Sequence, residues 1–268
     1  MHDEKRPSPE DKVSPQKATR IKDGNREEIN ETVAQEAVLR ISLNDREVVA
    51  LSCTPYDQAF LAAGFLASEG FLKGRDEIKS IDQSEGSVTV RTDASHEIPE
   101  DSQPKGILTS GCGKGKTFAD WENVNPLEDI MVNLDLTLSP NQVLELMSRF
   151  EERSGLFRQT GGVHSAALAG RDDILLFNED IGRHNAVDKI LGEALLKGID
   201  LKDKLLVTSG RVSSDIISKL WNCGLSVVVS RTAPTSLAVK MAQKLGITIA
   251  GFVRGKRMNV YSFPARIQ

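Results

Sequence analysis

The chain has 268 residues, of which 39% are hydrophobic and 27% are charged, a composition typical of a soluble globular protein with one or two domains. Its net charge of −4 and its aromatic content of 5% disfavour general binding to nucleic acid or to anionic membranes. No apolar run approaches the length of a membrane span, and the N-terminus lacks the apolar core of a secretory signal. We therefore expect a cytoplasmic protein that uses neither nucleic acid nor membrane as a partner.

The N-terminal half predicts a polar tail followed by a small domain. Residues 1–32 are polar and rich in charges, and we expect them to form a disordered tail. Residues 33–137 are expected to form an α+β domain. Its elements are a hairpin over 38–53 around Asn44-Asp45, a helix over 55–70, two strands around Glu85-Gly86 and a short strand at 107–109. That last strand runs into a glycine-rich segment.

The C-terminal half, residues 138–268, predicts an α/β domain that binds a nucleotide or cofactor. Ser139 and Gln142 form the pattern of a capping box, which starts a helix. Strands are then expected at 163–169, 174–178, 205–208, 226–230 and 247–252, with helices near 183–197, 213–222 and 235–245. This alternation is typical of a mixed, mainly parallel sheet with helical crossovers.

Basic residues follow three of these strands at the point where each strand ends. The segments are 209–211, 231–235 and 254–257, and none of them contains an acidic residue. In an open α/β sheet, ligands bind beyond the carboxyl ends of the strands, where helix N-termini also favour anions. A single arginine at such a place is more often solvated surface, but three loops on one edge indicate a site for a nucleotide or pyrophosphate.

The loop after the strand at 174–178 is mixed in charge. His184 lies near a helix start and His164 near a strand start, where a histidine that caps the core is the ordinary interpretation. Asp180, His184 and Asp188 could form one polar network under the site. The sequence gives no reason to assign any of them a catalytic role.

Three cysteines, Cys53, Cys112 and Cys223, lie far apart in the chain, and their odd number excludes a complete set of disulfides. This favours a reducing compartment. No two of them have C-x-x-C spacing, so no structural metal is expected. Cys53 and Cys223 lie in apolar contexts, and we expect them to be small buried residues.

The segment TSGCGKGKTF (109–118) places Cys112 among three glycines and two lysines. Glycines permit unusual backbone conformations and keep a loop exposed and mobile. Lys114 and Lys116 would favour the thiolate of Cys112. An exposed thiolate can attack a sulfur donor and then present the sulfur elsewhere, so Cys112 is the candidate catalytic residue.

Two other site types share features with this segment. It is one glycine short of the phosphate-binding G-x-x-x-x-G-K-[ST] loop, because Ser110 takes the place of the first glycine, and the residues that follow soon reach Pro126 instead of opening a long helix. The zinc deaminase signature H-x-E…P-C-x-x-C is absent, since Glu97 follows His96 directly. The residues therefore favour cysteine chemistry over both alternatives.

From about residue 36 to the C-terminus, the chain resembles the formate dehydrogenase accessory sulfurtransferase family (FdhD). The segments that carry the resemblance are CTPYDQAFLAAGFLASEG (53–70), TSGCGKGK (109–116), TGGVHSAAL (160–168), EDIGRHNAVDKILG (179–192), SGRVSSDIISK (209–219) and APTSLAVKMAQKLGITIAGFVRGKRMNVYS (233–262). So many matches in the same order argue against a chance similarity.

The resemblance implies a fold similar to that of cytidine deaminases, without their zinc chemistry, and a homodimer. It implies a sulfur carrier that accepts sulfur from a cysteine desulfurase and passes it to the bis-molybdopterin guanine dinucleotide cofactor before that cofactor enters the formate dehydrogenase apoprotein. The persulfide-bearing cysteine of the family maps onto Cys112. The cofactor-binding stretch maps onto one of the basic segments, namely Phe252, Val253, Arg254, Gly255, Lys256 and Arg257.

The cysteine segment departs from the family pattern. Many relatives resemble S-S-C-G-x-C-G-K with two cysteines, whereas here either Gly115 replaces the second cysteine or Cys112 is itself the second. A mechanism through an internal disulfide is therefore disfavoured, while a one-cysteine relay is not. The alternative function is a non-catalytic chaperone that delivers the cofactor without moving sulfur. The residues leave open whether the metal is molybdenum or tungsten and which formate dehydrogenase is served.

Overall fold

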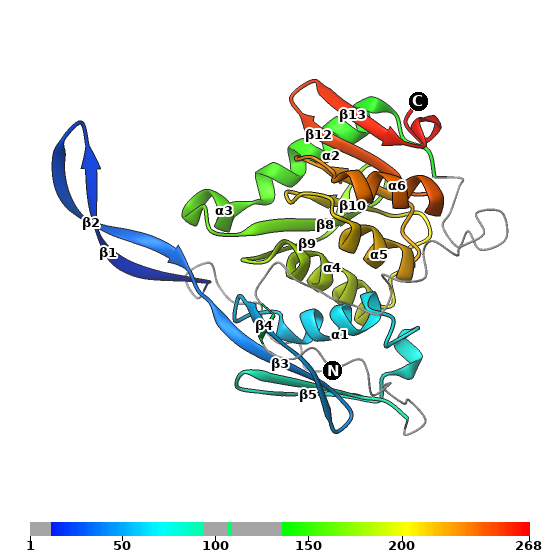
Figure 1. Ribbon diagram of the computed structural model, residues 1–268, viewed down its shortest axis with the longest axis horizontal. Coiled ribbons are helices and arrows are strands. Elements are labelled where there is room, and N and C mark those ends of the chain that lie inside the picture. The colour runs from blue at the N-terminus through cyan, green and yellow to red at the C-terminus, as the bar shows by residue number, and fades with distance from the viewer. Residues whose placement is uncertain (1–11, 94–106, 109–135) are drawn as a thin grey trace.

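A computed structural model of the chain describes residues 12–93, 107–108 and 136–268. These residues form a six-stranded sheet, a five-stranded sheet and a separate two-stranded hairpin, with helices against both larger sheets (Figure 1). The five-stranded sheet is built from residues before 109 and the six-stranded sheet from residues after 163, on either side of the boundary expected near residue 137. The expected α/β fold is confirmed, and the likeness to cytidine deaminases stays a prediction.

The six-stranded sheet has the order β13-β12-β11-β10-β8-β9. Its strands are β8 (His164–Ala169), β9 (Ile174–Asp180), β10 (Leu205–Thr208), β11 (Val227–Ser230), β12 (Thr248–Arg254) and β13 (Arg257–Ser262). Only the pairings of β10 with β11 and of β11 with β12 are parallel, so the expectation of a mainly parallel sheet is wrong. Connection length explains this, because the short turns after β8 and β12 can join only antiparallel strands.

Helices cover both faces of this sheet. α2 (Pro140–Arg153) packs on one face, while α4 (Arg183–Lys197), α5 (Ser214–Asn222) and α6 (Ser236–Leu245) pack on the other (Figure 1). The predicted capping box starts α2, since the Gln142 N–H donates to the Ser139 hydroxyl and the Ser139 N–H donates to the Gln142 side chain. The buried stripe of α2, which includes Val143, Met147 and Phe150, closes the core on that face. The strand ends are thus held by two apolar layers.

The five-stranded sheet has the order β5-β6-β3-β4-β7 and is covered by one helix. Its elements are β3 (Ala37–Leu43), β4 (Arg46–Cys53), α1 (Gln58–Ser68), β5 (Ser80–Ser84), β6 (Ser87–Arg91) and β7 (Ile107–Leu108). Both predicted hairpins are confirmed, and the first turns at Asn44, whose φ is 54°. The helix begins three residues later than Pro55, because Asp57 at its N-cap adopts a left-handed backbone conformation.

Two glycines let α1 and α4 cross with their backbones in contact. A Cβ atom added at Gly64 would lie 1.8 Å from the Asp188 carbonyl oxygen, and one added at Gly192 would lie 1.9 Å from the Phe60 carbonyl oxygen. No side chain fits at either position, because the obstructing atoms are backbone and cannot turn away. This crossing joins the two halves of the chain.

We therefore expect Gly192→Ala to destabilise the protein by about 3 kcal/mol, the upper part of the range for overpacking. Helix propensity alone would favour alanine by about 1 kcal/mol, so a decrease in the free energy of unfolding reports the steric clash. The free energy of unfolding from urea titrations checks this. Gly155→Ala is the matched control, since a Cβ there meets no atom within 4 Å. An unchanged stability for Gly192→Ala would contradict the close crossing.

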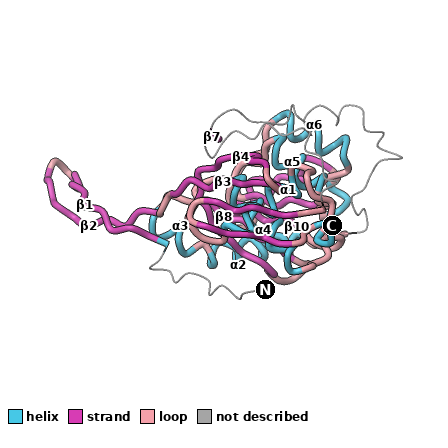
Figure 2. The backbone as a smooth tube through the Cα atoms, turned by 90° about the horizontal axis from the view of Figure 1, so that it is seen from below, coloured by secondary structure: helices cyan, strands magenta, loops and turns pink. Residues whose placement is uncertain are grey.

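Residues 13–34 form a projecting hairpin, so the expectation of a disordered tail is wrong for this stretch. β1 (Val13–Lys22) pairs with β2 (Asn25–Ala34) over its whole length, and the pair extends away from the body (Figure 2). Asp23 and Gly24 both have positive φ, 51° and 81°, as a two-residue type I′ hairpin turn requires. A polar composition excludes a buried core, but it does not prevent the backbone from pairing with itself. The Asp-Gly pair was the signal for this turn.

The root of the hairpin is anchored to the body. Gln35 donates through its side chain to the Val13 carbonyl (3.1 Å), and Val13 and Ala34 pack against a small core of Tyr56, Leu156 and Val163. Farther out, most side chains of both strands are exposed. The hairpin therefore takes its stability from the turn, the backbone ladder and the root contacts.

Some short elements were not predicted. They are the helix α3 (Gly155–Thr160), the strand β13 and two 3-10 turns, Arg75–Glu77 and Pro264–Arg266. β13 was missed because its first residue was assigned to a basic loop. Across the ranges 12–93, 107–108 and 136–268, no helix has the length and apolar character that crossing a membrane requires.

Candidate functional site

The carboxyl ends of four strands meet at one edge of the six-stranded sheet. β9, β10, β11 and β12 point the same way, because β8 lies between β9 and β10 and is antiparallel to both. β8 starts at this edge, and its first residue, His164, pairs opposite Asp180 at the end of β9. The prediction that the loops after these strands share one edge is therefore confirmed.

Hydrogen bonds join three of these loops into one continuous rim. The Val212 N–H donates to the Ala233 carbonyl (3.1 Å), and the Thr235 N–H donates to the Val212 carbonyl (2.9 Å). The Phe252 N–H donates to the Thr232 carbonyl (3.0 Å), which ties the end of β12 to the same loop. We call this surface the basic rim and define it as residues 209–213, 231–235 and 252–257.

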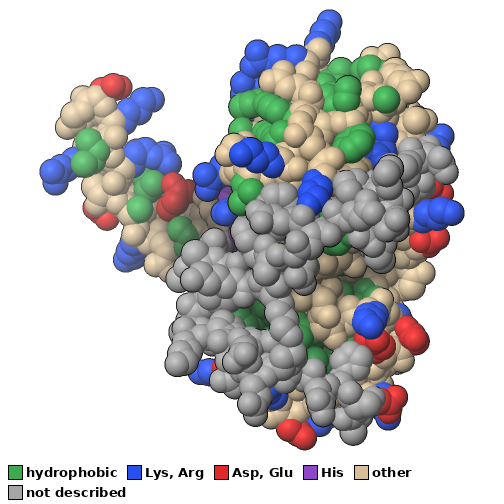
Figure 3. Space-filling view, turned by 45° about the vertical axis from the view of Figure 1, so that its right-hand side comes forward, with side chains coloured by type: hydrophobic (Ala, Val, Ile, Leu, Met, Phe, Trp, Pro, Cys, Tyr) green, Lys and Arg blue, Asp and Glu red, His purple; other side chains and the backbone are tan. Residues whose placement is uncertain are grey.

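The segment 252–257 supplies most of the exposed positive charge on the rim. Arg254, Lys256 and Arg257 are exposed, and none of them forms an ion pair with another residue in the described ranges. Basic side chains also gather at the top of the molecule in the space-filling view, where β12 and β13 lie (Figures 1 and 3). Val253 is fully buried in the core on the α2 side, so its side chain cannot contact a ligand at the rim.

Phe252 is held in a left-handed backbone conformation, with φ of 52°, where the pairing of β12 with β13 is irregular. Such a conformation costs a non-glycine residue about 1 kcal/mol or more, and strain of this kind clusters at functional sites. The guanidinium carbon of Arg254 lies 6.0 Å from the Phe252 ring centre, at the outer limit of a cation–π contact. The rim thus presents an aromatic ring and a guanidinium side by side.

Arg231 contributes less positive charge to the basic rim than the sequence suggested. Its guanidinium forms an ion pair with Glu151 of α2, which neutralises its charge locally. The exposed side chain of Arg211 lies on the loop after β10. Among Arg211, Arg231 and Arg254, one from each predicted basic loop, Arg211 and Arg254 are therefore the better candidates for binding an anion.

His164 and His184 lie beside the loop after β10. His164 Nδ1 is 3.4 Å from Ser209 Oγ, and His184 Nε2 is 3.3 Å from Ser213 Oγ. Burial and the neighbouring Arg183 guanidinium lower the pKa of both imidazoles, that of His184 to about 3. At neutral pH both rings are therefore uncharged hydrogen-bonding groups.

A buried ion pair joins the middle of α4 to the end of β9, beside the chain that follows β4. The Lys189 ammonium lies 2.8 Å from the Asp180 carboxylate, and both side chains are fully buried. Thr54 donates to Asp180 through its N–H (3.1 Å) and its hydroxyl (2.8 Å), and that hydroxyl accepts from Lys189 (2.6 Å). The Gly182 N–H and the Asn185 side chain donate to the other carboxylate oxygen, both at 2.9 Å. Every lone-pair direction of this carboxylate is in use, which indicates a structural role.

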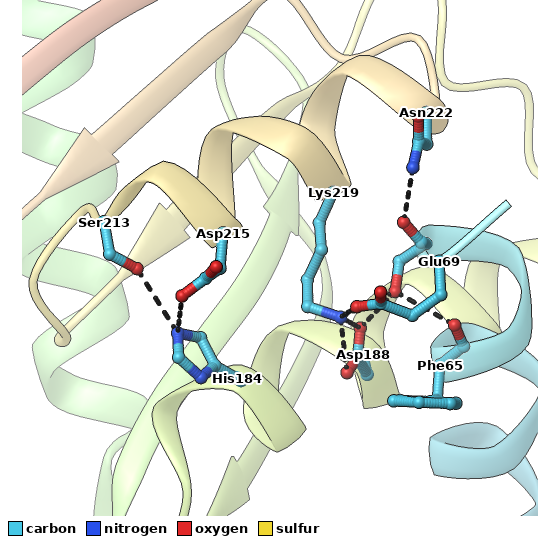
Figure 4. Close-up of polar contacts among 9 residues, drawn as sticks. Phe65, Glu69, His184, Asp188, Ser213, Asp215, Lys219 and Asn222 are labelled. Atoms are coloured by element: carbon cyan, nitrogen blue, oxygen red, sulfur yellow. Dashed lines mark hydrogen bonds and ion pairs between the residues drawn. The ribbon is translucent and has the colours of Figure 1, made fainter. Parts of the chain in front are cut away.

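A second buried network lies among α1, α4 and α5 (Figure 4). The Lys219 ammonium lies 3.0 Å from Asp188 and 2.9 Å from Glu69, and it donates to the Ser68 hydroxyl at 2.8 Å. The Ser68 hydroxyl donates in turn to Asp188 (2.7 Å), and Asn222 donates to the Ser68 carbonyl (2.7 Å). These contacts hold three helices from both halves of the chain together.

The expectation that Asp180, His184 and Asp188 form one network is therefore wrong. Asp180 pairs with Lys189, Asp188 pairs with Lys219, and His184 contacts α5. The two lysines were missed because a lysine in a helix is ordinarily an exposed residue, and no local pattern marks a buried one. Only the packing of helices from distant parts of the chain supplies their partners.

Two of the three cysteines lie in the described ranges, and both are free. Burial, together with nearby carboxylates, raises the pKa of Cys53 and of Cys223 to about 12. Cys53 is fully buried as expected, whereas Cys223 keeps partial exposure. Neither thiol ionises at neutral pH, so neither is a good nucleophile. Cys112, Lys114 and Lys116 lie outside the described residues.

No group of three or more His, Cys, Asp and Glu side chains within the described ranges is arranged to hold a metal ion. The donors at this edge are instead guanidinium, ammonium, hydroxyl and imidazole groups. Such donors suit an anionic ligand rather than a cation.

Similarity to known proteins covers nearly the whole chain. The model of the FdhD/NarQ family matches residues 34–268. A protein of Listeria innocua named sulfur carrier protein FdhD is 41% identical over 259 residues, which are 96% of this chain and 99% of the relative. A protein of the same name from Bacillus subtilis strain 168 is 41% identical over 251 residues, which are 93% of this chain and 95% of the relative.

A solved structure agrees with these sequence matches. The crystal structure of a Desulfotalea psychrophila protein assigned as a formate dehydrogenase accessory protein superposes with a TM-score of 0.78 at 31% identity, covering 96% of this chain and 99% of that protein. The family match and the relatives span both sheets and the basic rim. The chain therefore belongs to the FdhD/NarQ family.

Proposed function

We propose that this protein carries sulfur as a persulfide on Cys112 and transfers it to the bis-molybdopterin guanine dinucleotide cofactor, with molybdenum or tungsten, that formate dehydrogenase requires. Relatives at 41% identity are named sulfur carrier protein, which supports the carrier role. The proposed donor is a cysteine desulfurase, and the proposed recipient of the completed cofactor is the formate dehydrogenase apoprotein. A homodimer and a reducing cytoplasm, which keeps the thiol free, belong to the same proposal.

The observation that supports the proposal most directly is the position of β7, the strand that ends four residues before Cys112. β7 ends at Leu108 and pairs in parallel with β4. Cys112 follows Leu108 by four positions, which limits the chain between them to about 14 Å. The Ser52 carbonyl, near the end of β4, accepts a hydrogen bond from Asn185 at the start of α4 (2.8 Å). Leu108, the last described residue before Cys112, therefore lies near the start of α4, at the edge that carries the basic rim.

In the first step, the Cys112 thiolate attacks the outer sulfur of a persulfide on the donor. A sulfur–sulfur bond forms to Cys112, the sulfur–sulfur bond of the donor breaks, and the donor cysteine leaves as a thiolate. No net oxidation occurs, because one persulfide replaces another. Lys114 and Lys116 favour the attacking thiolate by proximity in sequence.

In the second step, the outer sulfur leaves Cys112 for the metal of the cofactor. The sulfur becomes a sulfide ligand by gaining two electrons from the reduced metal, and Cys112 is released as a thiolate. The protein contributes position, because the guanine nucleotide end of the cofactor would be held by the basic rim while its metal end reaches the cysteine.

Mass spectrometry separates this relay from a chaperone that moves no sulfur. After incubation with a cysteine desulfurase and cysteine, we expect the Cys112 peptide to gain one sulfur atom that a reducing agent removes. The peptides of Cys53 and Cys223 are internal controls, because burial keeps both thiols protonated. Sulfur on none of the peptides, or on all three equally, would contradict the relay.

Binding of the nucleotide by the basic rim is tested by replacing the exposed arginines of the segment 252–257. We expect Arg254→Gln combined with Arg257→Gln to weaken GDP binding about tenfold or more, since each removes a charge-assisted contact. Calorimetric titration with GDP measures the change. Arg171→Gln is the matched control, because Arg171 is exposed on the β8–β9 turn at the opposite edge of the same sheet. Equal affinity in the double variant and the control would remove segment 252–257 from the proposed site.

A further inference from the structure

The projecting hairpin of β1 and β2, residues 13–34, carries charges that are sorted by strand, and we call it the arm. β1 contains three cations and no acidic residue, whereas β2 contains three glutamates and one arginine. The space-filling view shows side chains of both signs on the arm, away from the body (Figure 3). A hairpin of only two strands is marginally stable in water by itself, so we expect the arm to pack on a further surface.

The two faces of the arm differ in what they contact. At the root, Val13 and Ala34 point to one face and pack against the body. Because side chains alternate along a strand, their neighbours Ser14 and Val33 point to the other face, where Val33 is 38% exposed. We call this second face the open face. Its members are the ladder pairs Ser14 with Val33, Gln16 with Glu31, Ala18 with Ile29, Arg20 with Glu27, and Lys22 with Asn25.

On the open face, the charged side chains of β1 are all cations and those of β2 are all carboxylates. Arg20 lies opposite Glu27 in the ladder, and its guanidinium is 3.5 Å from the Glu31 carboxylate. Farther toward the root, Ala18 lies opposite Ile29, and both are partly buried. The open face therefore has a cationic half, an anionic half and an apolar pair that spans both strands.

A twofold axis along the arm makes this face complementary to a second copy of itself. Such a rotation places β1 of one copy over β2 of the other at the same height, so each residue faces the type of residue that is its own ladder partner. Arg20 then faces Glu27 of the second copy, and Ala18 faces Ile29 of the second copy. By symmetry each of these contacts occurs twice.

Other arrangements of two arms are less favourable. Any twofold axis across the arm pairs like strand with like strand, which opposes like charges. Pairing the edge of β1 with the edge of β2 in a second copy does not close and continues into a filament. The face that packs on the body lacks complementary pairs, because the same rotation would set Ile21 against Arg26 and Lys17 against Asn30.

The size of the arm shows what else the interface needs. Each strand has 10 residues and so spans about 34 Å, and a two-stranded ribbon is about 10 Å wide, so one face covers roughly 300 Å². That is less than half of the ~800 Å² that each partner buries in a standard interface. An axis along the arm also brings the two roots together, where α3 contacts β2 and Phe157 is 48% exposed. The body beside the root would therefore supply the remaining area.

We propose that the open face of the arm docks on the same face of a second copy of this chain, with the twofold axis along the arm. The inference rests on the proposed function for the existence of a homodimer, and it adds the surface that forms it. Complementary charges on such a surface fix the orientation of the partners and exclude wrong ones more than they add affinity.

Reversal of one charge at a time tests the docking surface, with sedimentation equilibrium as the measurement of molar mass. We expect Arg20→Glu and Glu27→Arg each to raise the dissociation constant of the homodimer about tenfold or more, since each sets like charges against one another twice. Lys17→Glu is the matched control, because Lys17 lies on β1 but on the other face, and it should keep the wild-type constant.

An equimolar mixture of the Arg20→Glu and Glu27→Arg proteins separates docking from folding. Each chain then meets the opposite charge on its partner, so we expect a heterodimer about as tight as the wild-type homodimer. Mixing cannot rescue an arm that has lost its structure, because neither chain regains its own ladder pair.

Two results would overturn the docking surface while leaving the homodimer in place. One is a pair of single variants that dimerise as tightly as the wild type, and the other is a mixture that associates no more tightly than either variant alone. A monomeric wild type would remove the homodimer together with its surface. Sulfur loading of Cys112 by a desulfurase, measured on the wild-type protein, tests the relay separately from all of these outcomes.

Discussion

Replacement of Cys112 by alanine is expected to reduce sulfur transfer to background. The other two thiols cannot take over the reaction, because burial raises the pKa of Cys53 and Cys223 to about 12 and leaves them protonated at neutral pH. With a single cysteine in the segment 109–118, no second thiol can rescue the persulfide. Formate dehydrogenase activity in cells that lack the native protein measures the loss.

Two controls make this result specific to sulfur chemistry. Cys112→Ala should bind GDP with the affinity of the wild type, since the basic rim is built from other residues. Cys223→Ala should restore formate dehydrogenase activity, since its thiol is not ionised. If Cys112→Ala restored activity as well as Cys223→Ala does, the relay would be excluded and the cofactor chaperone would take its place.

Replacement of Lys189 by alanine is expected to cost about 3–5 kcal/mol of stability, the range for removing one partner of a buried ion pair. The variant leaves the Asp180 carboxylate charged, fully buried and without its cation. It also removes the ammonium that donates to the Thr54 hydroxyl and so links the chain after β4 to the middle of α4. Urea unfolding followed by circular dichroism measures the free energy of unfolding.

A second variant separates the charge from the loss of packing. Lys189→Met combined with Asp180→Asn removes both charges and keeps similar volumes, so it should lose less stability than Lys189→Ala alone. Arg40→Ala is the surface control, because Arg40 and Glu47 are both about half exposed and 3.5 Å apart, and such pairs contribute about 1 kcal/mol or less. A cost for Lys189→Ala as small as that for Arg40→Ala would show that the buried pair is dispensable for stability.

Local patterns predicted most of the elements correctly. The capping box at Ser139 and the turns at Asn44 and Gly86 each depend on residues close together in the chain, and each is found in the structure. The strands before the basic loops were also found, because a run of buried aliphatic residues bounded by turn formers is a strong signal. The hairpin at 13–34 was missed although Asp23-Gly24 marks its turn, because composition was given more weight than turn chemistry.

Strand direction could not be predicted in the same way. The alternation of strands and helices suggested parallel pairing, but β8 enters the sheet between β9 and β10 and β13 folds back on β12. Which strands become neighbours depends on how apolar faces pack across the whole domain, and no short segment contains that information. The strands β9, β10, β11 and β12 nevertheless run in the same direction, so the prediction that their loops share one edge was correct although the predicted pairing was wrong.

The sequence by itself determined the family, the single cysteine among glycines and lysines, and the basic residues of 252–257, because each is a property of consecutive residues. Only the tertiary structure decided which charges are paired: Arg231 is neutralised by Glu151, Lys189 and Lys219 are buried with carboxylates, and Arg183 is packed on Gly210. The physical reason is that the free energy of a charge depends on its burial and on its neighbours in space. Those neighbours come from distant parts of the chain.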